Sequence, residues 1–433
     1  MTPLLWGLVG LILLLVLLLC NVKIGTAMSI VGLFGLSMIL NPTAAITKLG
    51  TAPFDTISSY DYAVMPLFVL FANIIAKTGI GADLYTFFYR TIGRLRGGMA
   101  MASIVACAIF AAISSSTVAT AVTIGLIALP EMKKLGYKEE LATGSVAAGG
   151  TLGVMIPPSG YLITYGVITG TSISKLFMAG IIPGAILALA FVIVIRIICT
   201  IHPDWGPKGT AYTGKEIWEA ARKCIDIVIL IIFVLGGIMI GAFTATEAGA
   251  LGCVGAVILT TIRKKMNLST FIDAVKGTLK NTGMVYFMML SAMVLNAFVS
   301  LTTITPTLTK IISAWSIDYR VVAIGIIAIY LFLGCFLNGT AMLLLTMPIF
   351  YPIMTGMGAD PIWLGALAVL CMEMGALTPP VGLNCFVVAG LDKSVPLEKV
   401  FKGIIPFLLA QFVVAAIVIL FPQVATWLPY LAK

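Results

Sequence analysis

Two short polar segments in an otherwise apolar chain carry oxygen atoms suited to binding a small cation. The first runs from Ser114 to Thr117 and the second from Asn338 to Thr340. Hydroxyls, amides and free backbone carbonyls are hard oxygen ligands for such ions, and hydroxyls and amides also donate hydrogen bonds to a carboxylate. Small polar residues also serve helix packing in membranes, which is the alternative interpretation of either segment alone. Their equivalent positions, with Ser116 and Asn338 related by an offset of 222 residues, favour a binding role.

Proline pairs recur at the same offset. GVMIPPSG spans Gly153 to Gly160, and GALTPPVG spans Gly375 to Gly382. Two successive prolines remove backbone donors and leave upstream carbonyls unpaired, which is costly in hydrocarbon unless something binds them. The half-helix after such a break presents free N–H groups and a positive dipole end that suit an anionic carboxylate. One kink is common in membrane helices, whereas two at a fixed offset indicate a transporter built from two repeats.

Composition places these segments in a membrane. Of the 433 residues, 60% are hydrophobic and 10% are charged, and the mean hydropathy of +1.12 predicts a polytopic α-helical membrane protein. The first apolar stretch, Leu4 to Cys20, has no basic residue before it and no small-residue cleavage site after it, so we expect a span and not a signal peptide. The net charge is +9, and the basic residues cluster in short loops between the predicted spans. This distribution is typical of residues that set the orientation of membrane spans and does not indicate nucleic-acid binding. Eight cysteines without CxxC, and the lone His202, support neither a zinc site nor a disulfide framework.

Loop charges predict how the helices cross. Two apolar stretches, 98–130 and 320–352, are expected to be re-entrant hairpins, because the first has Arg90, Arg94 and Arg96 before it and Lys133, Lys134 and Lys138 after it. A single crossing would put positive charge on both faces, whereas a hairpin keeps both ends on one side. Full spans are expected near 4–20, 24–40, 62–78, 140–170, 175–199, 225–243, 246–262, 281–302, 361–391 and 402–428.

This arrangement puts both termini outside and assigns a side to every basic residue. Only Lys48, Lys175, Lys310, Arg320 and Lys433 fall outside, and the other 21 of the 26 Lys and Arg, Lys77 among them, fall inside. The first hairpin then opens from the cytoplasm and the second from the far side. The predicted fold class is an all-α polytopic membrane protein with two inverted structural repeats, each with a re-entrant helical hairpin and a broken transmembrane helix. Between them, 214–224 predicts an interfacial cytoplasmic helix, with an ordinary solvated linker helix as the alternative.

One carboxylate lies away from the predicted membrane surfaces. Glu373 stands two residues before the second broken segment, and an intramembrane carboxylate is a functional candidate by default. It acts either in ion coupling or gating, or in helix packing as a protonated or paired group. No Lys or Arg lies at the predicted midplane. The charge of an anion therefore has to be balanced by dipoles, hydroxyls and co-bound cations.

Together these motifs resemble a known family over nearly the whole chain. They are Ser114–Ala119, GVMIPPS with Tyr165-Gly166, Ser174–Phe177, Ala179–Gly184, Phe336–Gly339 and Gly375–Gly382. The chain resembles the large membrane subunit (M subunit) of tripartite ATP-independent periplasmic (TRAP) transporters. The resemblance implies sodium-driven uptake of an organic acid anion, such as sialic acid or a C4-dicarboxylate, across the bacterial inner membrane. It implies two partners, a periplasmic substrate-binding protein and a small four-helix (Q-type) membrane subunit. Some members carry an acidic residue where Asn338 stands.

The resemblance also implies an elevator mechanism and a division of the chain. Residues 1–97 and 175–319 would be scaffold, 98–174 and 320–392 the two halves of a moving transport domain, and 393–433 a C-terminal span. The positions matched to sodium ligands are Ser114, Ser115, Ser116, Gly150, Gly153, Asn338, Gly339, Thr340, Gly375 and Thr378. Substrate is expected near Ser116, Pro157, Ser159, Thr340 and Pro379.

Three alternative functions differ in what they require of the sequence. A stand-alone sodium- or proton-coupled anion symporter or antiporter would use the same repeats without a binding protein. An intramembrane enzyme needs HExxH, a paired aspartate constellation within spans or a serine with a histidine base; none occurs, so the chain is predicted not to be an enzyme. A channel could also use broken helices to line a pore. No GxxxxGK[ST] motif occurs, so no ATP site is expected.

Overall fold

The computed structural model describes residues 2–20, 22–58, 60–76, 79–314, 317–380 and 382–431. Within these ranges every secondary-structure element is a helix, and one isolated antiparallel bridge joins Arg96 to Lys208. Lys77 and Lys433, which the charge count assigned to opposite sides, and Val381 of the second proline motif lie outside the described residues.

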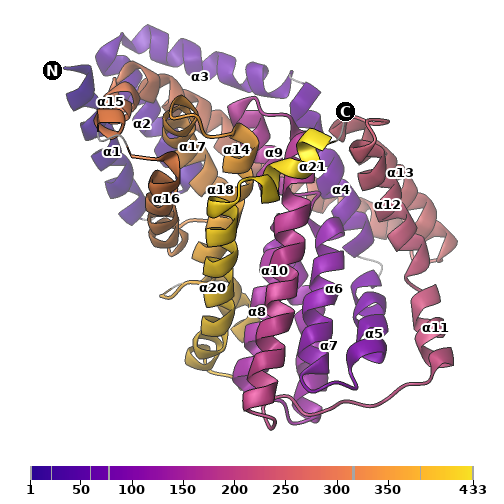
Figure 1. The fold of residues 1–433 in the computed structure, drawn as a ribbon. Helices are drawn as coiled ribbons and strands as arrows, with labels where there is room; N and C mark the ends of the chain where they lie inside the picture. The colour runs from indigo at the N-terminus through magenta and orange to yellow at the C-terminus, as the bar shows by residue number, and fades with distance from the viewer. Residues whose placement is uncertain are drawn as a thin grey trace.

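The first set of helices precedes the hairpin that carries the first polar segment (Figure 1). They are α1 (Pro3–Leu19), α2 (Ile24–Ile39), α3 (Pro42–Ile57), the short 3-10 helix η1 (Tyr60–Ala63), α4 (Val64–Ala76) and α5 (Ile80–Ile92). A second set from mid-chain packs with it: α11 (Gly214–Arg222), α12 (Ile225–Met239), α13 (Ala245–Ile262), α14 (Leu268–Leu301) and α15 (Ile304–Ala314). Helix α14 lies against α2 and α4, and α13 lies against α4 and α12.

The polar segments and proline pairs lie in the remaining helices. The first half has α6 (Gly98–Ser114), α7 (Thr117–Lys134), α8 (Glu139–Met155), α9 (Gly160–Thr169) and α10 (Ile173–Ile201). The second half has α16 (Tyr319–Gly334), α17 (Gly339–Gly356), α18 (Pro361–Leu377), α19 (Leu383–Leu391), α20 (Leu397–Leu420) and α21 (Gln423–Leu431). Each half therefore contains a helical hairpin and a helix broken at its proline pair, as predicted.

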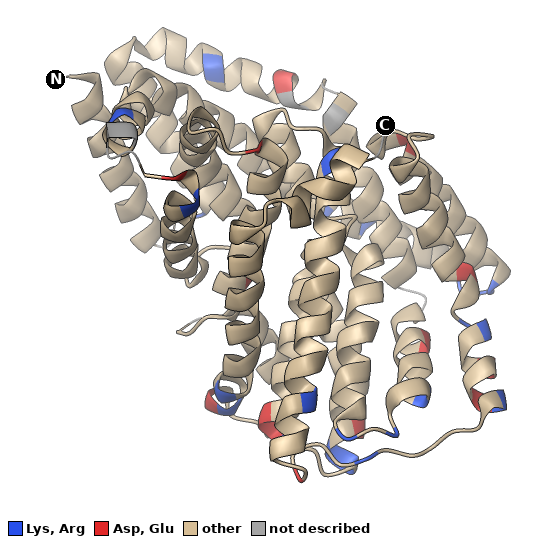
Figure 2. Cartoon of the chain, viewed as in Figure 1, with Lys and Arg blue, Asp and Glu red and all other residues tan. Residues whose placement is uncertain are grey.

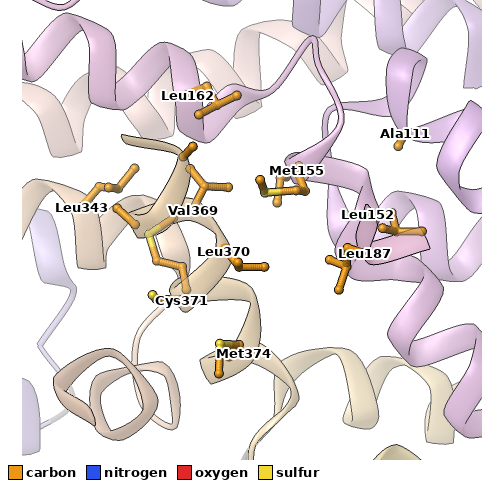
Figure 3. Packing of buried hydrophobic residues seen from close by; sticks show 14 of the residues in the cluster. Ala111, Leu152, Met155, Leu162, Leu187, Leu343, Val369, Leu370, Cys371 and Met374 are labelled. Carbon is orange, nitrogen blue, oxygen red and sulfur yellow. The ribbon is translucent and has the colours of Figure 1, made fainter. Parts of the chain in front are cut away.

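The two halves share an apolar core where their broken helices meet. Figure 3 shows Leu152 and Met155 of α8 facing Val369 and Leu370 of α18, with Leu187 of α10 alongside. All five side chains are buried. Small residues of α8 let α6, α7 and α20 pack closely around it, so nearly the whole of that helix is inaccessible. The first break is thus buried in a packed environment, whereas Pro379 and Pro380 of the second break are exposed.

Charged side chains gather at helix ends and loops, and long uncharged lengths lie between them (Figure 2). By length and composition, six described helical segments can cross a membrane, or seven if the bent pair α4–α5 counts as one. The six are Glu139–Thr169, α10, α13, α14, α17 and α20. Helices α1, α2, α6, α12, α16 and α18 are apolar but shorter. The multi-span fold is confirmed, while the count of ten full spans stays a prediction.

Three helices were not predicted, because a search for apolar spans overlooks amphipathic ones. Helix α3 begins where the Asn41 side chain accepts a hydrogen bond from Ala44 N and Pro42 occupies the first turn. Helix α5 is amphipathic. Arg263, at the end of α13, forms ion pairs with Asp83 of α5 and with Asp226 of α12, which holds α5 in place. Helix α15 likewise has polar residues on one face.

Two predicted spans differ at their ends. The span predicted at 281–302 begins at Leu268, because the Asn267 side chain caps a longer helix, α14. The span predicted at 402–428 is divided at Phe421, because Pro422 lacks an amide donor and starts the separate helix α21. The predicted helix near 214–224 is present as α11, and Arg90 Nη1 of α5 donates to its Glu216 carbonyl at 2.9 Å.

The packing of α10 differs from the division implied by the resemblance. Residues 175–319 were expected to be scaffold, yet α10 lies against α6, α8, α18, α20 and α21. Gly180 and Gly184 explain this position, since a Cβ at Gly180 would lie 2.6 Å from the Met155 carbonyl. Helix α10 therefore packs with the hairpin and broken helix of its own half. The division into fixed and moving domains stays a prediction.

Candidate functional site

The first polar segment forms the tip of the α6–α7 hairpin. Helix α6 ends at Ser114 and α7 begins at Thr117, so Ser115 and Ser116 make the turn. Ser115 adopts a left-handed backbone conformation with φ of 49°, uncommon for a residue with a side chain. The Ser116 hydroxyl accepts a hydrogen bond from Ala119 N at 3.3 Å and caps α7. The tip is therefore a built turn and not a loose loop.

Hydrogen bonds join this tip to the first proline break. Ser115 Oγ donates to the Pro158 carbonyl at 2.7 Å. Ser114 Oγ bonds to Thr120 Oγ1 and donates to the Ser116 carbonyl at 3.2 Å. Beyond the break, the Ser159 hydroxyl caps α9 by accepting from Leu162 N at 3.3 Å. The tip thus supplies a hydroxyl donor to a backbone carbonyl of the break itself.

Two glycines of α8 allow the tip to approach. A Cβ at Gly153 would lie 2.7 Å from the Ser116 carbonyl oxygen and 2.7 Å from Thr120 Oγ1. A Cβ at Gly150 would lie 3.1 Å from the Thr117 carbonyl oxygen. Any larger residue would push the tip away from the helix. The first tip therefore gathers hydroxyl and carbonyl oxygens against α8, which is the chemistry a small cation requires.

The second tip joins α16 to α17 and holds fewer polar contacts. The Asn338 side chain accepts from Ala341 N at 3.0 Å and caps α17. Gly375 of α18 packs against α16, where a Cβ would lie 2.7 Å from the Tyr330 carbonyl oxygen. Thr378 Oγ1 donates to the Met374 carbonyl within its own helix at 2.7 Å. Among the described residues, the side-chain contact from this tip to the second break is made by Cys335, whose Sγ lies 3.4 Å from the Pro379 carbonyl oxygen and 3.3 Å from the Leu331 carbonyl oxygen of its own helix.

A tyrosine from the first half contacts the second tip. Tyr161 follows the first break in α9, and a Cβ at Gly339 would lie 2.8 Å from its hydroxyl oxygen. The helices that carry these two residues, α9 and α17, pack together. Sequence reasoning missed Tyr161, although its position directly after Gly160 was a usable signal. Thr120 and Cys335, which also take part in the tip contacts, were missed as well, because their roles depend on the packing of different helices.

Several buried polar groups near the breaks have no hydrogen-bond partner. Glu373 is 1% exposed and its Oε2 has none within the described chain. Both polar side-chain atoms of Asn384, in the first turn of α19, are likewise unpaired. Helices α18 and α9, which carry Glu373 and Tyr161, pack together, so a charge on Glu373 acts on Tyr161. Unpaired buried polar groups are costly, so these positions are candidates for an ion, a proton or a water.

The structure places the predicted site residues in two groups linked by Tyr161. The first contains Ser114, Ser115, Ser116, Gly150, Gly153, Pro157 and Ser159. The second contains Asn338, Gly339, Thr340, Gly375, Thr378 and Pro379. Within the described residues, no hydrogen bond joins Asn338 or Thr340 to the second break. The assignment of these residues to sodium and substrate stays a prediction.

Comparison with known proteins identifies the family to which this arrangement belongs. The family model described as "Tripartite ATP-independent periplasmic transporter, DctM component" matches residues 11–424. The chain belongs to this family. It is a TRAP transporter large permease, a multi-pass membrane protein of an all-α transporter fold, as the motifs around the two tips predicted.

Two relatives show the breadth of the TRAP family. The chain is 33% identical over 400 residues to the C4-dicarboxylate TRAP transporter large permease protein DctM of Pseudomonas aeruginosa, covering 92% of this chain and 93% of that protein. It is 30% identical over 396 residues to the sialic acid TRAP transporter large permease protein SiaM of Vibrio cholerae, covering 91% and 92%. Among solved structures, the YdaH transporter of Alcanivorax borkumensis has a similar fold, with a TM-score of 0.62 at 11% identity and 89% of each chain covered.

Proposed function

We propose that this TRAP permease carries out sodium-coupled uptake of an organic acid anion across the bacterial inner membrane by an elevator movement. The observation that carries the proposal is the first tip, where Ser115 Oγ reaches the Pro158 carbonyl at 2.7 Å and Gly153 admits the Ser116 carbonyl. Backbone and hydroxyl oxygens gathered at a helix break suit a dehydrated monovalent cation. A cation held there, beside the start of α9, adds positive charge where an anionic carboxylate would bind.

The proposed driving force is sufficient for accumulation. Each net positive charge moved inward across about 100 mV supplies roughly 2.3 kcal/mol. Two such charges support roughly thousand-fold accumulation before the sodium gradient is counted. The substrate class is an organic acid anion of the kind named for the relatives, a C4-dicarboxylate or sialic acid. The proposed partners are a periplasmic substrate-binding protein and a small four-helix membrane subunit, because the family model describes one component of a tripartite transporter.

Glu373 is assigned to coupling or gating in this proposal. Its buried Oε2 has no hydrogen-bond partner within the described residues, its charge acts on Tyr161, and Tyr161 contacts the second tip at Gly339. A change in the charge of Glu373 would therefore be felt at the second tip through Tyr161. The same connection links the start of α9, after the first break, to the second tip.

The test is uptake by proteoliposomes that contain the full chain, its small subunit and its binding protein. The double variant Ser115→Ala with Ser116→Ala should abolish sodium-driven uptake. The matched control is Ser103→Ala with Ser145→Ala, since both hydroxyls are buried away from the tips and donate to carbonyls of their own helices. Unaltered sodium-driven uptake by the tip variant would overturn the site. Uptake that proceeds equally without the binding protein would favour the stand-alone symporter instead.

A further inference from the structure

Four basic side chains line one cavity at the end of the molecule where α5, α6 and α10 meet. The cavity has a volume of about 460 Å³ and is lined by Arg94, Leu95, Arg96, Arg196 and Lys208. No acidic residue lines it, and none of the four cations forms an ion pair within the described chain. We refer to this group as the basic cavity. Figure 2 shows both basic and acidic residues along this lower edge of the molecule.

Backbone pairing between two distant segments builds the basic cavity. Arg96, between α5 and α6, forms an antiparallel bridge with Lys208, in the connection from α10 to α11. The bridge is flanked by hydrogen bonds from Gly97 N to the Gly206 carbonyl at 2.8 Å and from Gly209 N to the Gly93 carbonyl at 3.0 Å. The bridge thereby brings Arg96 and Lys208, which are 112 residues apart in the sequence, to the same cavity.

Glycines make this approach sterically possible. Gly97 has φ of 73°, a left-handed conformation that side chains disfavour. A Cβ at Gly206 would lie 2.6 Å from Cys199 Sγ and 2.9 Å from Gly97 Cα. Tyr137 Oη also donates to the Pro207 carbonyl at 3.0 Å, which ties the connection to the end of α7. Like charges repel, so a structure that holds four of them together without counter-charge is suited to an anion.

An apolar stripe on α10 begins beside these cations. Leu189, Ile193, Ile197 and Ile201 recur every four residues and therefore share one helix face. Their exposed fractions lie between 49% and 66%, although all four are large hydrophobic residues. Arg196 lies three residues after Ile193 and is therefore its neighbour on the surface of α10. Because Arg196 also lines the basic cavity, the cavity adjoins the apolar stripe. The surface thus combines a cluster of cations with an adjoining strip of apolar helix.

We propose that the basic cavity binds the phosphate of an anionic phospholipid whose acyl chain lies along the α10 stripe. Guanidinium groups donate paired hydrogen bonds to phosphate oxygens, and three of the four cations are arginines. A free phosphate satisfies the cations equally well but leaves the apolar stripe without an occupant. A phospholipid matches both parts, because its charged head and apolar tail are joined at the spacing of a membrane surface. This site lies apart from the transport site and does not depend on the proposed function.

The test measures binding of short-chain phosphatidylglycerol to the purified full chain in neutral detergent by native mass spectrometry. Phosphatidylcholine of the same chain length and inorganic phosphate are titrated in parallel. Arg94→Gln with Arg196→Gln should weaken phosphatidylglycerol binding at least tenfold. The matched control, Lys276→Gln with Lys280→Gln in α14, removes two exposed charges that form no ion pair among the described residues and should change binding less than twofold.

A second variant separates lipid from free phosphate. Ile193→Asn with Ile197→Asn should weaken phosphatidylglycerol binding at least fivefold and leave phosphate binding unchanged. The proposal is overturned if phosphatidylcholine binds as tightly as phosphatidylglycerol, or if the control pair loses as much binding as the cavity pair. Inorganic phosphate that binds as tightly as phosphatidylglycerol would replace the lipid with a soluble phosphate. Circular dichroism and monodisperse size-exclusion profiles of each variant exclude misfolding as the cause.

Discussion

The two hairpin tips are equivalent in the repeat, yet they hold their polar groups differently. At the first tip, hydroxyls of Ser114 and Ser115 bond to Thr120 and to the Pro158 carbonyl of the break. At the second tip, the Asn338 side chain caps its own helix, and the side-chain contact to the described part of the break is that of the Cys335 thiol. The first tip is thus fastened to its broken helix by strong donors, and the second by one weak donor.

The same contrast recurs one turn before the breaks. Thr151 and Glu373 are equivalent at the 222-residue offset. Thr151 donates to the Ala148 carbonyl at 2.7 Å and accepts from Gln411 Nε2 at 3.3 Å, so its hydroxyl is fully used. Within the described residues, Oε2 of Glu373 has no hydrogen-bond partner. We infer that the first half is preorganised, whereas the second half changes its hydrogen bonding when an ion or substrate arrives.

The largest expected effect comes from adding one methyl group to the first half. Gly153→Ala should lower sodium-driven uptake more than tenfold, because its Cβ would press on the Ser116 carbonyl and Thr120. Overpacking of this kind costs about 1–3 kcal/mol. Gly375→Ala should also reduce uptake, but less, if the second tip adapts. Gly283→Ala in α14, with nothing within 4 Å, is the control. Equal losses at Gly153 and Gly375 would remove the proposed difference in rigidity.

A second prediction concerns the buried carboxyl and its counterpart. Glu373→Gln should lower uptake about tenfold and alter its dependence on pH, because the group that can change charge beside Tyr161 is lost. Thr151→Val should instead reduce the free energy of unfolding by about 1 kcal/mol, which lowers the melting temperature. The pH profile of uptake should not change. Both are measured on the same proteoliposome preparations. A wild-type pH profile for Glu373→Gln would show that the carboxyl serves only packing.

The third prediction addresses the cap of the second hairpin. Asn338→Asp keeps an N-cap acceptor and adds a formal charge, so half-maximal uptake should require several-fold less sodium. Asn338→Ala removes the cap, which destabilises the helix by about 1 kcal/mol. Half-maximal uptake by this variant should require several-fold more sodium. Asn338→Ser retains the cap without the charge and should lie near the wild type. If all three variants share one sodium dependence, Asn338 is a structural cap only.

The smallest expected effect is at a surface contact between the halves. Lys133 Nζ of α7 bonds to Asp392 Oδ2, after α19, at 2.9 Å, and the Ser394 hydroxyl donates to Oδ1 at 2.6 Å. The Ser394 hydroxyl and then Lys133 lower the pKa of this exposed carboxyl from 3.8 to about 2. A lowered pKa stabilises the folded state above pH 4, and this contribution is lost as the pH falls toward 2.

Asp392→Asn should therefore reduce the free energy of unfolding by less than about 1 kcal/mol at pH 7. The difference from wild type should shrink between pH 4 and pH 2, as followed by thermal melts in detergent. A difference that stays constant over this range would show that the carboxylate charge does not contribute. Uptake should be unchanged, because the contact lies at the ends of α7 and α19 and away from both tips.

Much of the site was accessible from the sequence, for a definite reason. Ser116 and Asn338, and the two proline pairs, are local signals: each residue type imposes its own backbone or hydrogen-bonding requirement wherever it stands. The repeat then paired them. Helices α3, α5 and α15 were missed because a hydropathy search detects continuous apolar stretches and not amphipathic ones.

The sequence by itself determined that this protein is a helical membrane transporter with two related halves, and it located the breaks and tips. Composition and fixed spacing suffice for that, since the bilayer demands long apolar helices and prolines interrupt them. Only the tertiary structure decided which tip is fastened, that Tyr161 contacts Gly339, and that Oε2 of Glu373 lacks a hydrogen-bond partner within the described residues. It also decided that Arg96 and Lys208 share a cavity. Such contacts join residues far apart in the chain, and they depend on how closely glycine-bearing helices and loops can approach.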